Sequence, residues 1–289
     1  MWIRSAGAAC AAALLLQAPT FHSQTRLVVL QVSVRNARGE VVTNLPRDAF
    51  SVYENGKAQP VSVFRRDDLP ASVGLLIDNS GSMRPIRSTV ETAALAFAHA
   101  SNPDDELFVM NFADKVELDV PFTSDRAVLA RGIARADAVG GTAMREAIQQ
   151  AERYLHDHGT RERRALLIVT DGNDNESSVT LDSITRAAQQ REIVVYAIGL
   201  FAHGGGAKDA RAALDHLTER SGGLAYYPET IDRVEAVAVD VAHQIRNQYT
   251  LGYAPLNQAL DGSYRAIQVK VAGPGHLYPR TRAGYVAMR

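Results

Sequence analysis

The stretch GLLIDNSGSM, residues 74–83, joins an apolar run to a cluster of side-chain oxygens. With Val73 before it, the run reads VGLLID, the continuous apolar pattern of a strand buried on both faces of a parallel sheet. Asp78, Ser80 and Ser82 follow within five residues. Oxygen-bearing side chains grouped directly after a buried strand are suited to binding an ion.

Strand patterns alternate with helix patterns downstream of this stretch. Apolar runs recur at 106–113, 163–172, 194–200 and 224–228. Between and after them, apolar residues recur at helical spacing in 86–100, 124–136 (with Ser124 as the expected N-cap), 140–158, 180–193, 210–223 and 230–248. This alternation predicts an α/β fold over residues 71–247, with a doubly wound, mostly parallel sheet and helices on both faces.

Both flanks of this α/β region have the pattern of strands and turns. Residues 25–70 include the strand-like RLVVLQVSVRN and the hairpin signal Asn55-Gly56, and residues 248–289 include a turn at Asp261-Gly262. We expect the two flanks to pack together as one small, sandwich-like β-unit.

The first 24 residues resemble a secretory signal peptide. One positive charge precedes an uncharged run from Ala6 to Leu16, which has the length of a signal-peptide core and is too short to span a bilayer. Cleavage near Ala18 or Ser23 would remove Cys10, the single cysteine, and would leave a secreted or periplasmic chain without disulfides. A packed or disordered N-terminal segment is the alternative interpretation.

The overall composition is that of a globular protein without a charged binding face. The 289 residues are 46% hydrophobic and 22% charged, with a net charge of −1. Nucleic-acid binding requires a clearly basic surface, and attraction to anionic membranes has the same requirement. Neither is therefore expected. No segment after the leader has the apolar length of a membrane helix, so we expect no integral span in the mature chain.

Two further loops are expected at the same edge of the sheet as Asp78. Thr142 follows two glycines at the start of a helix, and Asp171 ends the apolar run ALLIVT. In doubly wound sheets ligands bind at the carboxyl ends of strands. Together with Asp78, Ser80 and Ser82, these residues form a set of two carboxylates and three hydroxyls. Such oxygen donors favour Mg²⁺, Mn²⁺ or Ca²⁺ over zinc.

These residues carry a resemblance to the von Willebrand factor type A domain. DNSGS at 78–82 matches the family's D-x-S-x-S signature, and GGTAM and VTDG supply its later threonine and aspartate in the family's order. The resemblance covers about residues 71–228. The flanking segments LPRDAFSVYENGKAQPV and QYTLGYAP are similar to those of secreted bacterial members.

The resemblance implies a metal-ion-dependent adhesion site. In such a site Ser80 and Ser82 would bind the cation directly, and Thr142 directly or through water. Asp78 and Asp171 would act directly or through water. The cation, Mg²⁺ or alternatively Mn²⁺ or Ca²⁺, would leave one position for an Asp or Glu of a partner protein. The implied function is protein binding without catalysis.

Alternative interpretations remain for each residue and for the whole chain. Asp78, the serines and Thr142 could cap helices, and Asp171 could belong to a simple turn. Asp174 and Glu176 are interpreted as solvated loop charges. TDGNDN at 170–175 resembles a loop of Mg²⁺-dependent haloacid-dehalogenase phosphatases, in which Asp78 would be the nucleophile. Those enzymes have a second aspartate where this chain has Ser80, and a lysine where it offers only arginines. A scaffold with a vestigial ion site is the third possibility.

Overall fold

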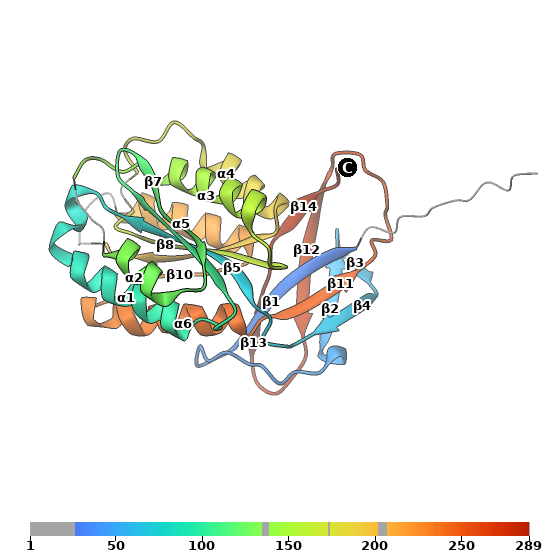
Figure 1. The fold of residues 1–289 in the computed structure, drawn as a ribbon. Helices are drawn as coiled ribbons and strands as arrows, with labels where there is room; N and C mark the ends of the chain where they lie inside the picture. Colours follow the sequence, from blue (N-terminus) through green and yellow to red (C-terminus); the bar gives the residue numbers. More distant parts are fainter. Residues whose placement is uncertain (1–26, 135–138, 173, 202–206, 289) are drawn as a thin grey trace, which may run out of the picture.

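A mostly parallel six-stranded sheet forms the centre of the molecule (Figure 1). The computed structural model describes residues 27–134, 139–172, 174–201 and 207–288. The strand order is β10-β9-β8-β5-β6-β7, and only β7 at the edge runs antiparallel to its neighbour. The strands are β5 (Ala71–Asp78), β6 (Glu106–Phe112), β7 (Val116–Thr123), β8 (Arg163–Thr170), β9 (Ile193–Gly199) and β10 (Ala225–Tyr226).

The central strand β5 lies at the point where the strand order changes direction. From β5 the chain continues to β6 on one side, and it later returns to β8 on the other side. All eight residues of β5 are buried, because helices cover both faces of the sheet. A crevice at the carboxyl end of β5, between two neighbouring strands, is the usual place for a ligand in such sheets.

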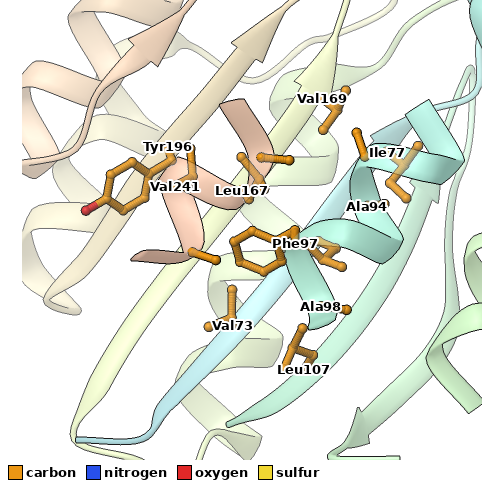
Figure 2. Close-up of a cluster of buried hydrophobic side chains, with 14 of the residues drawn as sticks. Val73, Ile77, Ala94, Phe97, Ala98, Leu107, Leu167, Val169, Tyr196 and Val241 are labelled. Atoms are coloured by element: carbon orange, nitrogen blue, oxygen red, sulfur yellow. The ribbon is translucent and has the colours of Figure 1, made fainter. Parts of the chain in front are cut away.

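Among the residues that the structure describes, three helices cover each face of the sheet. One face carries α1 (Arg87–Ala100), α2 (Arg126–Ile133) and α6 (Val234–Arg246), and the other carries α3 (Met144–His158), α4 (Leu181–Gln190) and α5 (Ala207–Ser221). Figure 2 shows the first of these cores, where Phe97 of α1 and Val241 of α6 pack against Val73 and Leu167 of the sheet. This architecture confirms the predicted α/β class.

The two flanks of the chain form a β-sandwich beside the core. One sheet has the order β13-β1-β11-β4 and the other β14-β12-β2-β3, so each sheet contains strands from both ends of the chain. The strands are β1 (Val28–Asn36), β2 (Phe50–Glu54), β3 (Lys57–Gln59), β4 (Val61–Arg65), β11 (Tyr249–Tyr253), β12 (Tyr264–Val271), β13 (Leu277–Arg280) and β14 (Gly284–Val286).

The inner faces of the two sheets share one apolar core with a buried acid at its rim. Leu30 and Val32 of β1 pack with Leu251 of β11, and alternate residues of β1 are buried as expected for one covered face. At Glu54, a single carboxylate oxygen accepts hydrogen bonds from Tyr253 (2.8 Å) and Tyr285 (2.9 Å) of different sheets. The turn after Glu54 is the predicted hairpin, and both of its central residues have positive φ.

Buried arginines attach the sandwich to the amino-terminal ends of the core strands. Arg163, the first residue of β8, donates to the backbone oxygens of Gln248 (2.8 Å) and Asp67 (3.0 Å). Arg282 donates to the backbone oxygen of Gln189 and to the Glu192 carboxylate, both at 2.9 Å. The sandwich therefore lies at the end of the sheet opposite to the carboxyl ends of the parallel strands (right in Figure 1).

A few local expectations differ from the structure. The edge strand β7 was not anticipated, and the N-cap of α2 is Asp125 rather than Ser124. The Asp125 carboxylate accepts hydrogen bonds from the Ala127 and Val128 amides, which a serine one position earlier does not reach. The proposed signal peptide at 1–24 lies outside the described residues. Among the helices that the structure describes, none is long and apolar enough to cross a membrane.

Candidate functional site

Asp78 occupies the carboxyl end of β5 with both carboxylate oxygens hydrogen-bonded. Its Oδ1 accepts from the Ser80 amide (2.9 Å), and its Oδ2 accepts from the Thr170 hydroxyl at the end of β8 (2.6 Å). The carboxylate is fully shielded from solvent. The Ser80 and Ser82 hydroxyl oxygens lie 3.1 Å apart. The first loop thus gathers its three predicted oxygen donors within a few residues.

These serines do not act as caps of the following helix. Ser80 precedes the short helix η2 (Gly81–Ile86) without a side-chain capping bond, and α1 likewise begins without one. Ser80 is buried, whereas Ser82 is exposed. The two hydroxyls instead hydrogen-bond each other, and the exposed Ser82 lies on the solvent side of the loop.

The electrostatics around Asp78 favour a nearby cation. Burial raises the pKa of the Asp78 carboxyl, and the negative charge of Asp171 adds to that rise. The hydrogen bonds from Thr170 and Ser80 act in the opposite direction. A buried carboxylate next to a second carboxylate is costly to ionise unless positive charge is close. The nearby Arg87 is already ion-paired within α1.

Thr142 lies in a second loop that contacts the first. The backbone N–H of Gly81 donates to the Gly140 oxygen (3.3 Å), and that of Val139 donates to the Asn79 oxygen (3.2 Å). Thr142 is buried. Its side chain does not cap α3, because the N-cap position is Ala143 and no side-chain capping bond forms there. The capping interpretation of Thr142 is thus not supported.

Asp171 begins the third loop, directly after β8. The neighbouring Gly172 has a φ of +79° and donates its N–H to the Thr170 hydroxyl (2.8 Å). A Cβ on Gly172 would lie 2.3 Å from the Phe201 ring, so only glycine fits there without movement. Thr170 therefore connects the Asp171 loop to Asp78, and the three loops meet at one edge of the sheet.

The donor set fits a small divalent cation. Carboxylate and hydroxyl oxygens are the donors that Mg²⁺ and Ca²⁺ prefer, and the Ser80 and Ser82 hydroxyls are close enough to hydrogen-bond each other at 3.1 Å. No three Asp, Glu, His or Cys side chains form a metal-binding group in the described ranges. The predicted set contains only two such residues, because its other donors are hydroxyls.

Several residues that shape the site were missed from the sequence, and one was misjudged. Asp174 is not a solvated loop charge, because its carboxylate accepts from Arg145 Nε of α3 at 2.7 Å and is only 9% exposed. Asn175 binds the Thr142 backbone, and Thr170 binds Asp78. No local sequence signal identifies these roles, because each partner lies about 30 or more positions away along the chain.

Comparison with known proteins finds a family match within the α/β core. Residues 73–173 match the family model of the von Willebrand factor type A domain. No curated protein matches the chain. Among solved structures, a von Willebrand factor type A protein from Catenulispora acidiphila has 13% identity and a TM-score of 0.53, covering 92% of this chain and 75% of that one.

Two proteins of bacterial pili are similar at the same level. The vWF domain of the type V pili tip protein Mfa5 from Porphyromonas gingivalis has 12% identity and a TM-score of 0.51, covering 61% of this chain and 95% of that one. The pilus adhesin SpaC from Lactobacillus rhamnosus GG, in its open conformation, has 12% identity and a TM-score of 0.51. That match covers 87% of this chain and 47% of SpaC. At such identities the similarity concerns the fold, and with the family match it leads to one conclusion: residues 73–173 match the von Willebrand factor type A domain, and the α/β core around them has the fold of solved von Willebrand factor type A proteins.

Proposed function

We propose that this chain is a metal-ion-dependent protein-binding module of the adhesion type. What supports the proposal is that three loops contact one another at the carboxyl edge of the sheet, and that these loops carry two carboxylates and three hydroxyls. The proposed ligands of the cation are Asp78, Ser80, Ser82, Thr142 and Asp171.

Mg²⁺ is the proposed ion, with Mn²⁺ and Ca²⁺ as the other oxygen-preferring candidates. The all-oxygen donor set supports these ions over zinc, and two aspartates would roughly balance a divalent charge. Ser80 and Ser82 would hold it through their hydroxyls, and Asp78 and Asp171 would balance its charge. Bound there, the ion would supply a Lewis-acidic position for an outside ligand.

The proposed partner is a protein that presents an Asp or Glu side chain. A cation with few directly bound carboxylates keeps positive charge that attracts another anion. Ser82 is exposed, so the serine side of the site is open to a partner. That solved relatives include a pilus tip protein and a pilus adhesin supports a binding role outside the cytoplasm. A secreted or periplasmic location is proposed on the same grounds and on the leader.

Catalysis is not part of the proposal. An aspartyl nucleophile must reach its substrate, but the Asp78 carboxylate is fully buried and both of its oxygens accept hydrogen bonds. Ser80 occupies the position at which the phosphatase mechanism needs a second aspartate. Turnover of para-nitrophenyl phosphate with Mg²⁺, abolished by Asp78→Asn, would contradict this view.

The proposal can be tested with the metal ion alone and then with a partner. Calorimetric titration with Mg²⁺ should show one site in the wild type and no measurable site in Ser82→Ala. Ser88→Ala, an exposed serine on the adjacent helix α1, is the matched control and should bind like the wild type. A pull-down from native extracts should then recover a protein in Mg²⁺ that is lost in EDTA and in Ser82→Ala. Equal binding of Mg²⁺ by both serine variants would refute the site.

A further inference from the structure

The loop that carries Asp171 also holds the backbone of Thr142. The Asn175 side-chain oxygen accepts the Thr142 N–H (2.9 Å), while the Asn175 N–H donates back to the Thr142 backbone oxygen (3.1 Å). The Glu176 N–H donates to the same oxygen at 3.2 Å. Both backbone polar groups of Thr142 are therefore bound by one segment that lies 33 positions downstream.

Two acidic side chains strengthen this connection at the first turn of α3. The Asp174 carboxylate accepts from the backbone N–H (3.2 Å) and from the Nε (2.7 Å) of Arg145. The Glu146 carboxylate accepts from the Ser178 amide at 2.6 Å and from its hydroxyl at 2.9 Å. Burial raises the pKa of Glu146, but hydrogen bonds from Ser177, Ser178 and Val179 together outweigh it and lower that pKa to about 2. The Thr142 and Asp171 loops thus form one hydrogen-bonded unit.

The connection to the Asp78 loop is sparser by comparison. In the described residues, the bonds between the Thr142 loop and that loop are two backbone bonds of 3.2 and 3.3 Å, made by Val139 and Gly81. The space between the Thr142 and Asp171 loops is also filled, since a Cβ on Gly141 would lie 3.0 Å from the Asn175 side-chain oxygen. The next residue, Ala143, is held by a bond from its N–H to the Ala113 oxygen after β6 (2.6 Å), whereas the backbone N–H and oxygen of Thr142 itself are bound from the Asp171 side.

We propose that Asn175 is a positioning residue that sets Thr142 as a metal ligand. The inference rests on the proposed function, since it assigns Asn175 an effect on cation binding. Asn175 acts through the backbone of Thr142 and makes the two outer loops approach the cation as one body. Residues that orient metal ligands in this way typically contribute about 10–100-fold to metal affinity.

A double-mutant cycle separates positioning from general stabilisation. Calorimetric Mg²⁺ titrations are compared for the wild type, Asn175→Ala, Thr142→Ala and the double variant. We expect Asn175→Ala to weaken Mg²⁺ binding by about 10-fold or more in the wild-type background. In the Thr142→Ala background the same change should have an effect below about 2-fold, because the ligand that it positions is gone.

Asn257→Ala is the matched control for this cycle. Asn257 also accepts a backbone N–H with its side chain, that of Ala259, but it lies in an exposed sandwich loop. The Asn257→Ala substitution should leave Mg²⁺ affinity unchanged. Asn175→Asp keeps an acceptor for the Thr142 N–H and should retain binding. An unchanged affinity in Asn175→Ala, or an equal loss with and without the Thr142 side chain, would overturn the proposal.

A second measurement judges Asn175 even if no cation binds. Amide hydrogen exchange at Thr142, recorded in EDTA, should accelerate at least about 10-fold in Asn175→Ala and stay unchanged in Asn257→Ala. A wild type that binds no cation would refute the proposed function, whereas unaccelerated exchange would refute the role of Asn175. If Asn175→Ala does not fold, Asn175→Ser, whose side chain is too short to reach the Thr142 N–H, replaces it in both measurements.

Discussion

Asp78 combines two roles that are usually separate, since it ends a buried strand and supplies charge to the candidate site. Its two oxygens bind the Ser80 amide and the Thr170 hydroxyl, so the carboxylate orients two of the three loops before any ion arrives. The raised pKa that burial causes in Asp78 shows what this position costs without a cation. Substitution at Asp78 therefore tests charge and geometry together.

Asp78→Asn should abolish cation binding and retain the fold. Asparagine has the same shape and an oxygen for the Ser80 amide, but it lacks the charge that a divalent ion needs. In the wild type, Mg²⁺ at about 100 times its Kd should raise the free energy of unfolding by about 2.7 kcal/mol. In Asp78→Asn the Mg²⁺-induced rise in Tm should disappear, as recorded by thermal unfolding with Mg²⁺ and with EDTA. A variant that no longer unfolds cooperatively would make Asp78 a structural residue instead.

Gly172→Ala should destabilise the protein through a steric contact beside Asp171. The new Cβ would meet the Phe201 ring at 2.3 Å and the Ala210 Cβ at 2.8 Å, in addition to the strain of a φ of +79°. Gly262→Ala, with a similar φ of +73° and nothing within 4 Å, isolates the conformational strain alone. Urea denaturation should show a loss about 1–3 kcal/mol greater for Gly172→Ala. Equal losses would mean that Phe201 moves aside.

The sequence predicts the oxygen donors of the candidate site better than the residues that position them. Asp78, Ser80 and Ser82 are recognisable because they lie within five residues after a buried strand. The bonds that Thr170 and Asn175 make are invisible in the sequence. Each of these side chains binds a residue far along the chain, and only the folded sheet brings the partners together. The five donors as a metal site stay a prediction until an ion is measured.

At the scale of elements, burial on both faces made the strands of the core easy to predict. β5 is apolar along most of its length because helices cover both sides of the sheet. β7 lies at the sheet edge, mixes exposed and buried positions, contains Pro121 and pairs with irregular register. Its weaker pattern reflects this one-sided environment, and that is why it escaped prediction.

Glu152 on α3 should make stability depend on pH. Burial raises the pKa of Glu152 from 4.5 to about 8, against the opposing charges of Arg191 and Arg153. Between these two pKa values the folded state holds a proton that the unfolded chain has lost, so the free energy of unfolding should fall as pH rises. Glu152→Gln cannot titrate. The free energy of unfolding of Glu152→Gln, relative to that of the wild type, should therefore rise by up to a few kcal/mol between pH 5 and pH 8.5.

Urea denaturation at several pH values measures this difference. The matched control is Glu219→Gln, which makes the same substitution at an exposed glutamate on α5 and removes no buried carboxyl. The Glu152 carboxylate has one oxygen 3.4 Å from Arg191 and another without a hydrogen-bond partner among the described residues. A Glu152→Gln variant that loses stability at high pH would show that the ion pair outweighs burial.

At the scale of the whole molecule, the arginine contacts between sandwich and core join two hydrophobic centres. Arg163 is 1% exposed and donates to backbone oxygens in both chain connections between sandwich and core, Asp67 in one and Arg246 in the other, both at 3.0 Å. Buried carbonyls that lose such a donor are left unsatisfied. We therefore expect the Arg163 hydrogen bonds to contribute more to the free energy of unfolding than the exposed ion pairs between sandwich and core.

Arg163→Met should lower the free energy of unfolding by roughly 2–4 kcal/mol, because one buried and three partly buried carbonyls lose their donor while the volume is nearly kept. The control is Arg65→Met, which removes an ion pair with Glu162 whose two side chains are 47% and 73% exposed. That change should cost less than about 1 kcal/mol. Urea denaturation of the two variants, followed by near-ultraviolet and far-ultraviolet signals, would measure both losses in the free energy of unfolding. Similar small losses would mean that the interface relaxes around the missing guanidinium.

Each sandwich sheet contains strands from both ends of the chain, and this has a consequence for biosynthesis. β1 emerges from the ribosome about 200 residues before β11, the strand that it pairs with. At 5–20 residues per second the early strand waits roughly 10–40 s, with its edges open to foreign strands. The α/β core of the nascent chain can fold first. The sandwich can fold only after the C-terminal strands β11 to β14 have been translated. A chaperone that shields extended segments would be most needed during that interval.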